Sequence, residues 1–308
     1  TIEHLVEFFI LLLSSVLGMF FLLSSAHLLQ FYLSLELSTI PVAALASFHL
    51  KNKLSSEAAI KMILSSAFSS GILLFGISLI YGVTGSLEFS TIASAIQIEP
   101  LSIMAFVFLI SAFAFKMSVV PFHLWTADVY EGAPIAVTAF LSVLSKATIS
   151  FAFLSVLYVV FSSYFSVWHP LLVGLSCATI FIGNLFAVRQ QNIKRFLAFS
   201  SIAQVGFILI GISSNNLQGV ASVIYFLLIY VFSNLAAFGV VGCISFLTNK
   251  ENIDDYKGLY QTNPWMSWIL AIAPFSLAGT PPTAGFFGKL FLLGSGISAR
   301  NYVSIPLA

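Results

Sequence analysis

The chain has 308 residues, of which 59% are hydrophobic and only 7% are charged, and its formal net charge is +1. Because soluble domains carry about 25% charged residues, this composition excludes an ordinary soluble protein and predicts a membrane protein surrounded by the lipid bilayer. The small net charge also excludes nucleic acid as a partner, since that binding depends on many Lys and Arg side chains that neutralise phosphates.

Long apolar stretches recur from one end of the chain to the other. About 20 helical residues cross the hydrocarbon core of a bilayer, and a helix satisfies its own backbone polar groups there. We therefore predict an all-α polytopic membrane protein with about nine transmembrane helices and no soluble domain. In chain order, the predicted spans are residues 5–25, 28–48, 56–81, 101–119, 134–160, 170–188, 196–212, 218–247 and 266–294.

The basic residues of the loops predict the orientation of these spans. With nine spans, the loops after the second, sixth and eighth lie on one side of the membrane. Loops rich in Lys and Arg stay on the side where the chain is made. These three loops and their flanks hold Lys51, Lys53 and Lys61, then Arg189, Lys194 and Arg195, and finally Lys250 and Lys257. Lys116, Lys146 and Lys289 have no loop to occupy, so we predict that they lie within the membrane.

Four charged residues therefore fall inside predicted spans. Glu36 lies in the middle of the second span, Lys146 is well inside the fifth, and Lys116 and Lys289 lie near prolines in the fourth and ninth. A lysine at the centre of a membrane helix costs about 2.5–3.5 kcal/mol. Structural ion pairs do not account for all four residues, because one carboxylate cannot pair with three lysines. We predict a proton relay, in which movement of Glu36 relative to a lysine loads or releases a proton.

Prolines interrupt two of these charged spans. Pro121 follows Lys116 in the fourth span, and Pro281 and Pro282 precede Lys289 in the ninth. Proline cannot donate a backbone hydrogen bond, so we predict a helix break about a turn after Lys116 and another at the proline pair. Two broken helices five spans apart are typical of an inverted repeat. One transmembrane domain, residues 1–308, would hold a first repeat over about 5–160 and a second, incomplete repeat over about 170–308.

Few other residues have side chains that could titrate, react or bind a metal. His123 lies at the end of the fourth span beside Trp125, and the sequence leaves open whether it passes protons or caps a helix at the interface. Trp125 itself is interpreted as an interfacial anchor. Cys177 and Cys243 are far apart in apolar stretches and are interpreted as packing residues. No metal-ligand spacing, nucleotide fingerprint or quinone motif is present, so we expect no metal and no cofactor on this chain.

Several long motifs resemble a known family. Tyr32-Leu-Ser-Leu-Glu36-Leu-Ser and Asn192-Ile-Lys194-Arg195 through Gly206 are two of them, and residues 55–61, 69–82, 115–132 and 278–289 are the others. The chain is similar, nearly end to end, to subunit 2 of NADH:ubiquinone oxidoreductase, respiratory complex I, which is called subunit N in bacteria. This family is one of the antiporter-like subunits of the membrane arm.

The resemblance implies a role for each buried charge. Glu36 matches the carboxylate of the family's fifth helix, and Lys116 matches the lysine of its broken seventh helix. Lys146 matches the eighth-helix lysine that connects the half-channels, and Lys289 matches the lysine of the broken twelfth helix. The resemblance therefore implies a proton-translocating core subunit, part of the proton-translocating NADH:ubiquinone reductase but without redox chemistry of its own.

The resemblance also implies partners, and it shows where this chain departs from the family. NADH, FMN, iron–sulfur clusters and ubiquinone are used by the complex as a whole and not by this chain. The expected partners are other membrane-arm subunits, including neighbouring antiporter-like subunits. The chain starts at Thr1, where the family's fourth helix begins, and stops after the twelfth. We expect the missing helices to be lost, supplied by a separate chain, or absent from this record.

Three alternative functions stay open. A multisubunit monovalent cation/proton antiporter has the same fold and buried charges, and a photosynthetic homologue of complex I differs in its electron donor. A structural spacer of the membrane arm would move no ions. The 32 phenylalanines, short loops and absent amino-terminal helices favour the mitochondrial inner membrane as the location, with a bacterial plasma membrane as the alternative.

Overall fold

The computed structural model describes residues 4–49, 51–248 and 250–298, and helices make up most of this part of the chain. Within these ranges, eight helical segments are long and apolar enough to cross a membrane. They are α1 (Leu5–Leu23), α2 (Leu28–Ala46), α3 (Lys53–Thr84), α5 (Pro100–Met117), the segment Ile135–Val160 that contains α7 (Ile135–Phe140) and α8 (Lys146–Ser155), the segment Ser162–Ala187 that contains α9 (Phe165–Ala187), α10 (Ile193–Ser213) and α11 (Leu217–Thr248). The predicted fold class, an all-α polytopic membrane protein, is confirmed.

Shorter helices complete the fold. They are α4 (Phe89–Ala95), α6 (Leu124–Gly132), α12 (Leu259–Thr262), α13 (Pro264–Ala278) and α14 (Ala284–Ser298). The predicted ninth span, residues 266–294, is therefore two apolar helices, α13 and α14, of 15 residues each. The predicted sixth span began at Pro170, but the helical segment begins at Ser162. The prediction was wrong there because Pro170 lies inside α9, near its beginning, and does not start it.

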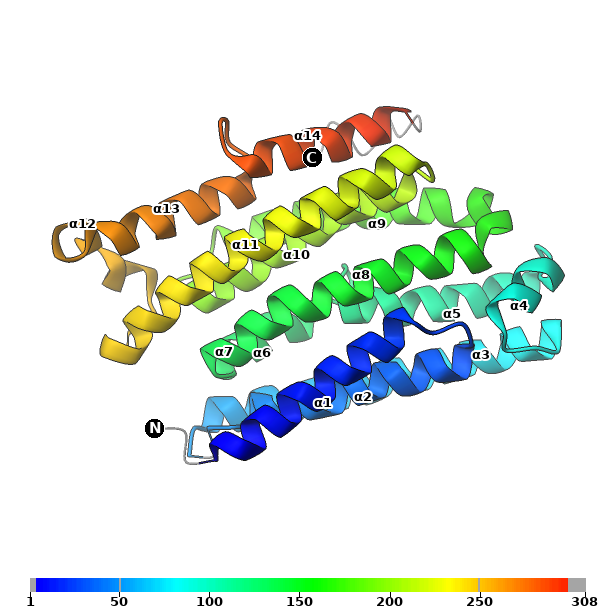
Figure 1. Cartoon of the computed structure of the whole chain (residues 1–308), viewed down its shortest axis with the longest axis horizontal. Coiled ribbons are helices and arrows are strands. Elements are labelled where there is room, and N and C mark those ends of the chain that lie inside the picture. Colours follow the sequence, from blue (N-terminus) through cyan, green and yellow to red (C-terminus); the bar gives the residue numbers. More distant parts are fainter. Residues whose placement is uncertain (1–3, 50, 249, 299–308) are drawn as a thin grey trace. The chain divides into compact units, whose positions relative to one another are not determined.

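Contacts divide the chain into two compact units. The first unit contains the chain up to Ser118 together with residues 122–137 and 148–168. In it, α1 packs against α2, α2 against α3, and α3 against both α5 and α6. Figure 1 shows α1, α2 and α3 as the blue and cyan helices of this unit. Asn52 caps α3 by accepting a hydrogen bond from the Leu54 backbone amide, as expected for an asparagine at a helix start.

The second unit contains residues 119–121, 138–147 and the chain from His169 onward. Its most deeply buried spanning helix is α10, most of whose residues are buried inside the protein. Both α11 and α14 pack against α10, and α13 packs against α11 (Figure 1). Because α10 has so little surface left for lipid, polar side chains on it face protein neighbours and not the bilayer.

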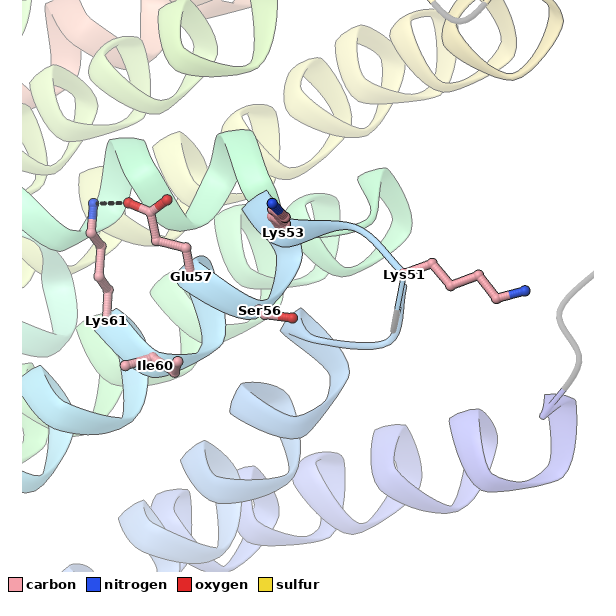
Figure 2. A pocket seen from close by; sticks show the side chains of 6 residues that line it. All are labelled: Lys51, Lys53, Ser56, Glu57, Ile60 and Lys61. Atoms are coloured by element: carbon pink, nitrogen blue, oxygen red, sulfur yellow. Dashed lines mark ion pairs between the residues drawn. The ribbon is translucent and has the colours of Figure 1, made fainter.

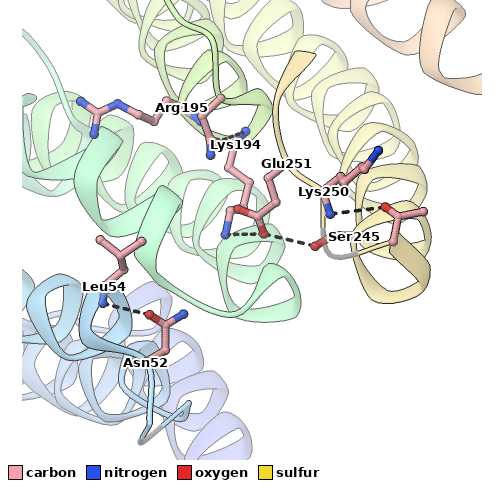
Figure 3. Close-up of polar contacts among 9 residues, drawn as sticks. Asn52, Leu54, Lys194, Arg195, Ser245, Lys250 and Glu251 are labelled. Carbon is pink, nitrogen blue, oxygen red and sulfur yellow. Dashed lines mark hydrogen bonds and ion pairs between the residues drawn. The ribbon is translucent and has the colours of Figure 1, made fainter. Parts of the chain in front are cut away.

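Backbone and side-chain contacts hold the start of α10 against the chain that follows α11. The Ile193 amide donates to the Glu251 carbonyl, and the Ile253 amide donates to the Gln191 carbonyl. The Lys194 ammonium, which is 6% exposed, lies 3.0 Å from the Glu251 carboxylate (Figure 3). Burial, together with the charge of Glu251, raises the pKa of the nearby Tyr256 hydroxyl to about 12. Tyr256 therefore stays neutral, and the Lys194–Glu251 ion pair joins the start of α10 to the chain after α11.

Two helix breaks share one pattern. α5 ends at Met117, Ser118 follows with a φ of 65°, and Pro121 comes three positions later. α13 ends at Ala278, Gly279 follows with a φ of 79°, and Pro282 comes three positions later. A residue in the left-handed region ends an α-helix by turning its backbone out of the helical path. The first break thus comes directly after Met117, closer to Lys116 than the predicted full turn, because Ser118 and not Pro121 ends the helix.

Candidate functional site

Lys116 lies among hydroxyl groups from two other helices of the first unit. Its ammonium donates to Thr39 Oγ1 on α2 at 2.9 Å and to Ser66 Oγ on α3 at 2.7 Å. An ammonium has three hydrogens to donate, and hydroxyls can both accept and donate. The two contacts therefore solvate the lysine inside the helix bundle with groups that can also pass a proton onward.

Glu36 belongs to the same network without touching Lys116 directly. The Ser70 hydroxyl on α3 donates to the Glu36 carboxylate, and Ser70 lies one helical turn after Ser66. Within the described residues no direct ion pair joins Glu36 to Lys116. Hydroxyls thus lie beside both the carboxylate and the ammonium, on neighbouring positions of α3.

The break after Lys116 is held by two side chains of the following segment. The Trp125 indole donates to the Phe115 carbonyl at 3.2 Å and stacks on the Phe115 ring. Thr126 Oγ1 donates to Ser118 Oγ at 2.6 Å. The interpretation of Trp125 as only an interfacial anchor was incomplete, because its N–H gives the Phe115 carbonyl, which also accepts the Ser118 amide at 3.0 Å, a second hydrogen bond at the helix end.

His123 directly precedes α6 and is 7% exposed. Its side chain makes no capping hydrogen bond to the helix. Both interpretations that the sequence left open for His123, a proton carrier and an interfacial cap, stay predictions.

Lys146 is buried in the second unit, with 2% of its surface exposed. Its ammonium donates to Ser201 Oγ on α10 at 2.7 Å, and that hydroxyl in turn donates to the Ala198 carbonyl at 2.8 Å. Lys146 begins α8 directly after a π-helical turn formed by Leu141–Ser145. Such turns widen a helix locally and occur frequently at functional sites.

Two residues of α11 fix this π-helical turn. The Tyr230 hydroxyl donates to the Ser142 carbonyl at 2.9 Å, and Ser142 Oγ donates to Asn234 Oδ1 at 3.4 Å. Asn234 Nδ2 donates to the Tyr230 carbonyl at 3.0 Å. All three residues are buried. The turn that carries Lys146 is therefore positioned by a polar cluster inside the protein.

Lys289 reaches from α14 to the end of α13. Its ammonium donates to the Ala278 carbonyl at 3.3 Å and lies 3.9 Å from the centre of the Phe207 ring. Ala278 is the last residue of α13, where carbonyls lack intrahelical partners and a cation is favoured. The ring face of Phe207 adds a second attraction for the charged form.

α10 contacts both Lys146 and Lys289. Ser201 binds Lys146 and Phe207 lies under Lys289, and the two positions are separated by about 9 Å along the helix axis. Gln204 lies between them and is 4% exposed. Its Oε1 atom accepts no hydrogen bond from any described residue. Along α10, the Ser201 hydroxyl is therefore followed by the Gln204 amide oxygen and then by the Phe207 ring.

The predicted residues are brought together within each unit. Glu36 and Lys116 contact neighbouring hydroxyls of α3 in the first unit, and Lys146 and Lys289 both contact α10 in the second. The partners of these charges were not predicted from the sequence; they are the polar residues Thr39, Ser66, Ser70, Ser142, Ser201, Gln204 and Tyr230, and the aromatic residue Phe207. Serine and threonine in spans usually bond their own helix, so they gave no signal. Asn234 was detectable, because an amide in the middle of an apolar span needs a partner.

The structure was also searched for side chains that could bind a metal ion. Within residues 4–49, 51–248 and 250–298, no three His, Cys, Asp or Glu side chains gather where they could hold a metal ion. The candidate site described above is made of lysines, a carboxylate, hydroxyls, an amide and aromatic rings, and its lysines and carboxylate can hold and pass protons.

A protein-family model with the description "NADH:quinone oxidoreductase/Mrp antiporter, TM" matches residues 25–307. The chain belongs to this NADH:quinone oxidoreductase/Mrp antiporter family. Subunit N of the NADH-quinone oxidoreductase of Azobacteroides pseudotrichonymphae genomovar. CFP2 is 48% identical over 303 residues, covering 98% of this chain. The predicted resemblance to the subunit N family is confirmed by this match. The chain spans 63% of the length of that relative.

Two solved structures have the same fold as this chain. A chain of respiratory complex I from Thermus thermophilus with bound aureothin is 32% identical, with a TM-score of 0.83, over 98% of this chain and 67% of its own length. A chain of the Mrp complex from Dietzia sp. DQ12-45-1b is 28% identical, with a TM-score of 0.89, over 96% of this chain and 57% of its own length. The antiporter-like architecture implied by the resemblance is therefore that of the family.

Proposed function

We propose that this chain is a proton-translocating core subunit of the membrane arm of a complex I, in which NADH oxidation by quinone drives the pump. The observation that carries the proposal is Lys146, an almost fully buried lysine whose ammonium is held by the Ser201 hydroxyl. Burying a lysine is costly, and membrane proteins retain such groups where ions or protons pass. The names of the relatives, NADH-quinone oxidoreductase subunit N, support the choice of complex.

The proposed path has one part in each unit. In the first unit, a proton moves between Glu36 and Lys116 through the hydroxyls of Ser70 and Ser66. In the second unit, a proton moves from Lys146 along α10 to Lys289. The open Gln204 acceptor between these lysines can orient a water molecule for that transfer. His123, buried beside the first break, is the remaining titratable group of the proposed relay.

The inverted repeat is part of the same proposal. The main division between the two compact units falls between Trp168 and His169, close to the predicted boundary between residues 160 and 170. Each proposed repeat also contains one helix break with a left-handed residue three positions before a proline, Pro121 in one and Pro282 in the other. Inverted repeats with paired broken helices are characteristic of transporters that bind their ion near the membrane centre.

Partners, cofactors and location follow from this assignment. The proposed partners are the other membrane-arm subunits, and NADH, FMN, iron–sulfur clusters and quinone are assigned to other chains of the complex. We place the chain in a bacterial plasma membrane, because the relatives and structures named above come from bacteria. The mitochondrial location, which rested on phenylalanine content, short loops and absent amino-terminal helices, has no support from these relatives.

A monovalent cation/proton antiporter is the second candidate, and the TM-score of 0.89 to an Mrp-complex chain favours it. An affinity tag on this chain, followed by purification from its native membranes, separates the two. The proposal expects a flavin-containing assembly that oxidises NADH and acidifies vesicles when NADH is added. Cation/proton exchange by an assembly that does not oxidise NADH would instead establish the antiporter.

The contact between Lys289 and Phe207 gives a specific prediction. Phe207→Leu keeps an apolar side chain but removes the ring face, whereas Phe207→Tyr keeps the ring. A cation–π contact contributes about 0.5–1 kcal/mol or more, so we expect Phe207→Leu to slow NADH-driven proton pumping by about two- to fivefold. Phe207→Tyr should stay close to the wild-type rate. Equal rates for the leucine variant and the wild type would show that the ring does not help Lys289.

A further inference from the structure

A hollow of about 460 Å³ lies beside the start of α3, away from the buried lysines. Its lining consists of Lys51, Lys53, Ser56, Glu57, Ile60 and Lys61. Figure 2 shows Lys53, Glu57 and Lys61 projecting from the same side of α3, with Lys51 extending from the preceding loop. Three of the six lining side chains are therefore cationic, and they lie where a membrane helix meets its loop.

The charges of this hollow are not balanced by the protein. Lys61 is neutralised, because its ammonium lies 2.7 Å from the Glu57 carboxylate and 2.5 Å from that of Asp128. Lys51 and Lys53 are exposed, and in the part of the chain that the structure describes neither forms an ion pair. The one carboxylate of the lining is thus already occupied, and two ammonium groups remain available to an anion.

An apolar strip continues from the hollow along the same side of α3. Ile60, Leu64 and Phe68 are 58%, 67% and 70% exposed. At about 100° per residue, these three positions and Lys53 fall within about 80° of one another around the helix. From Lys53 to Phe68 the strip runs about 22 Å along the axis, enough to extend from the surface across one leaflet of a core about 30 Å thick.

We propose that this surface binds an anionic diacyl phospholipid. Lys51 and Lys53 hold the phosphate of its headgroup, and an acyl chain lies along Ile60, Leu64 and Phe68. Basic pockets at the membrane surface bind lipid phosphates, and each nearby lysine adds to the attraction. A free phosphate would use the two lysines but would leave the apolar strip without a role.

The test compares two double variants in the intact assembly. Lys51→Gln/Lys53→Gln removes the two available charges. Lys250→Gln/Lys257→Gln is the matched control, because it removes the same charge from a loop predicted to face the same side, where the lysines already lie near Asp255 and Asp254. The assembly is placed in nanodiscs of equal phosphatidylglycerol and phosphatidylcholine, and the retained lipids are counted by native mass spectrometry.

We expect the wild type and the control to retain a phosphatidylglycerol that the Lys51→Gln/Lys53→Gln variant binds about tenfold more weakly. An equal loss in both double variants would reduce the effect to general surface charge and overturn the site. Displacement of the lipid by millimolar inorganic phosphate would show that the acyl chain contributes nothing, which also contradicts the proposal. A photo-crosslinker at Ile60 that captured a protein subunit and no lipid would assign the surface to a protein interface.

Discussion

Lys146→Met is expected to lower NADH-driven quinone reduction in coupled membranes by about tenfold or more, with the complex still assembled. Methionine fills nearly the same volume as the lysine stem, so the buried space around residue 146 stays occupied. The variant removes the ammonium that donates to Ser201 Oγ and that is proposed to pass a proton along α10. Turnover is measured as NADH oxidation in sealed vesicles, and assembly is measured by native gel electrophoresis.

Two controls make the Lys146→Met result specific. Lys250→Met changes an exposed lysine of a loop, and it should leave turnover unchanged. Ser201→Ala removes the hydroxyl but leaves the lysine, and it should have an intermediate effect because water can replace one hydrogen-bond partner. Wild-type turnover in Lys146→Met would show that the buried lysine serves packing and not proton transfer.

The second large effect is expected from Gly285→Ala, at the start of α14. A Cβ atom at residue 285 would lie 1.7 Å from the Ser276 carbonyl oxygen of α13 and 2.6 Å from the carbonyl carbon. Both atoms belong to the backbone, so the two helices must move apart. Overpacking of this kind costs about 3 kcal/mol, which corresponds to a fall of about 6–12 °C in the midpoint of thermal unfolding.

Gly294→Ala is the matched control, because it makes the same substitution further along α14. A Cβ atom at residue 294 would meet nothing within 4 Å, and alanine favours a helix over glycine by about 1 kcal/mol. The midpoint should therefore stay the same or rise slightly. Gly285→Ala should also slow pumping, because Lys289 is placed by the packing of α14 against α13. Equal midpoints for the two variants would contradict the close contact between the helices.

Much of the fold followed from hydropathy. Eight of the nine predicted spans correspond to helices that are long and apolar enough to cross a membrane, because about 20 apolar residues in a row have few alternatives to a spanning helix. One error lies where a proline had to be interpreted. Pro170 is tolerated inside α9, whereas the break predicted at Pro281 and Pro282 does separate α13 from α14. Sequence alone does not say whether a helix absorbs a proline or ends there.

The candidate site was predictable in its charges but not in its contacts. Glu36, Lys116, Lys146 and Lys289 stood out because charges are rare in apolar spans. Their partners did not stand out, because the sequence does not show whether a serine such as Ser201 forms a hydrogen bond with its own helix or with a buried lysine. The tertiary arrangement decides which serines matter, and it was also needed to place Phe207 under Lys289. Which of these residues carry protons stays a prediction from chemistry.

The central claim is that protons cross the membrane through the buried lysines of this chain. The most direct measurement is the number of protons translocated per NADH oxidised in sealed vesicles, with the wild-type complex compared with Lys116→Met. We predict fewer protons per NADH in the variant while the complex remains assembled, because Thr39 and Ser66 would no longer hold a protonatable group. An unchanged ratio, with the variant assembled to the wild-type level, would contradict the claim.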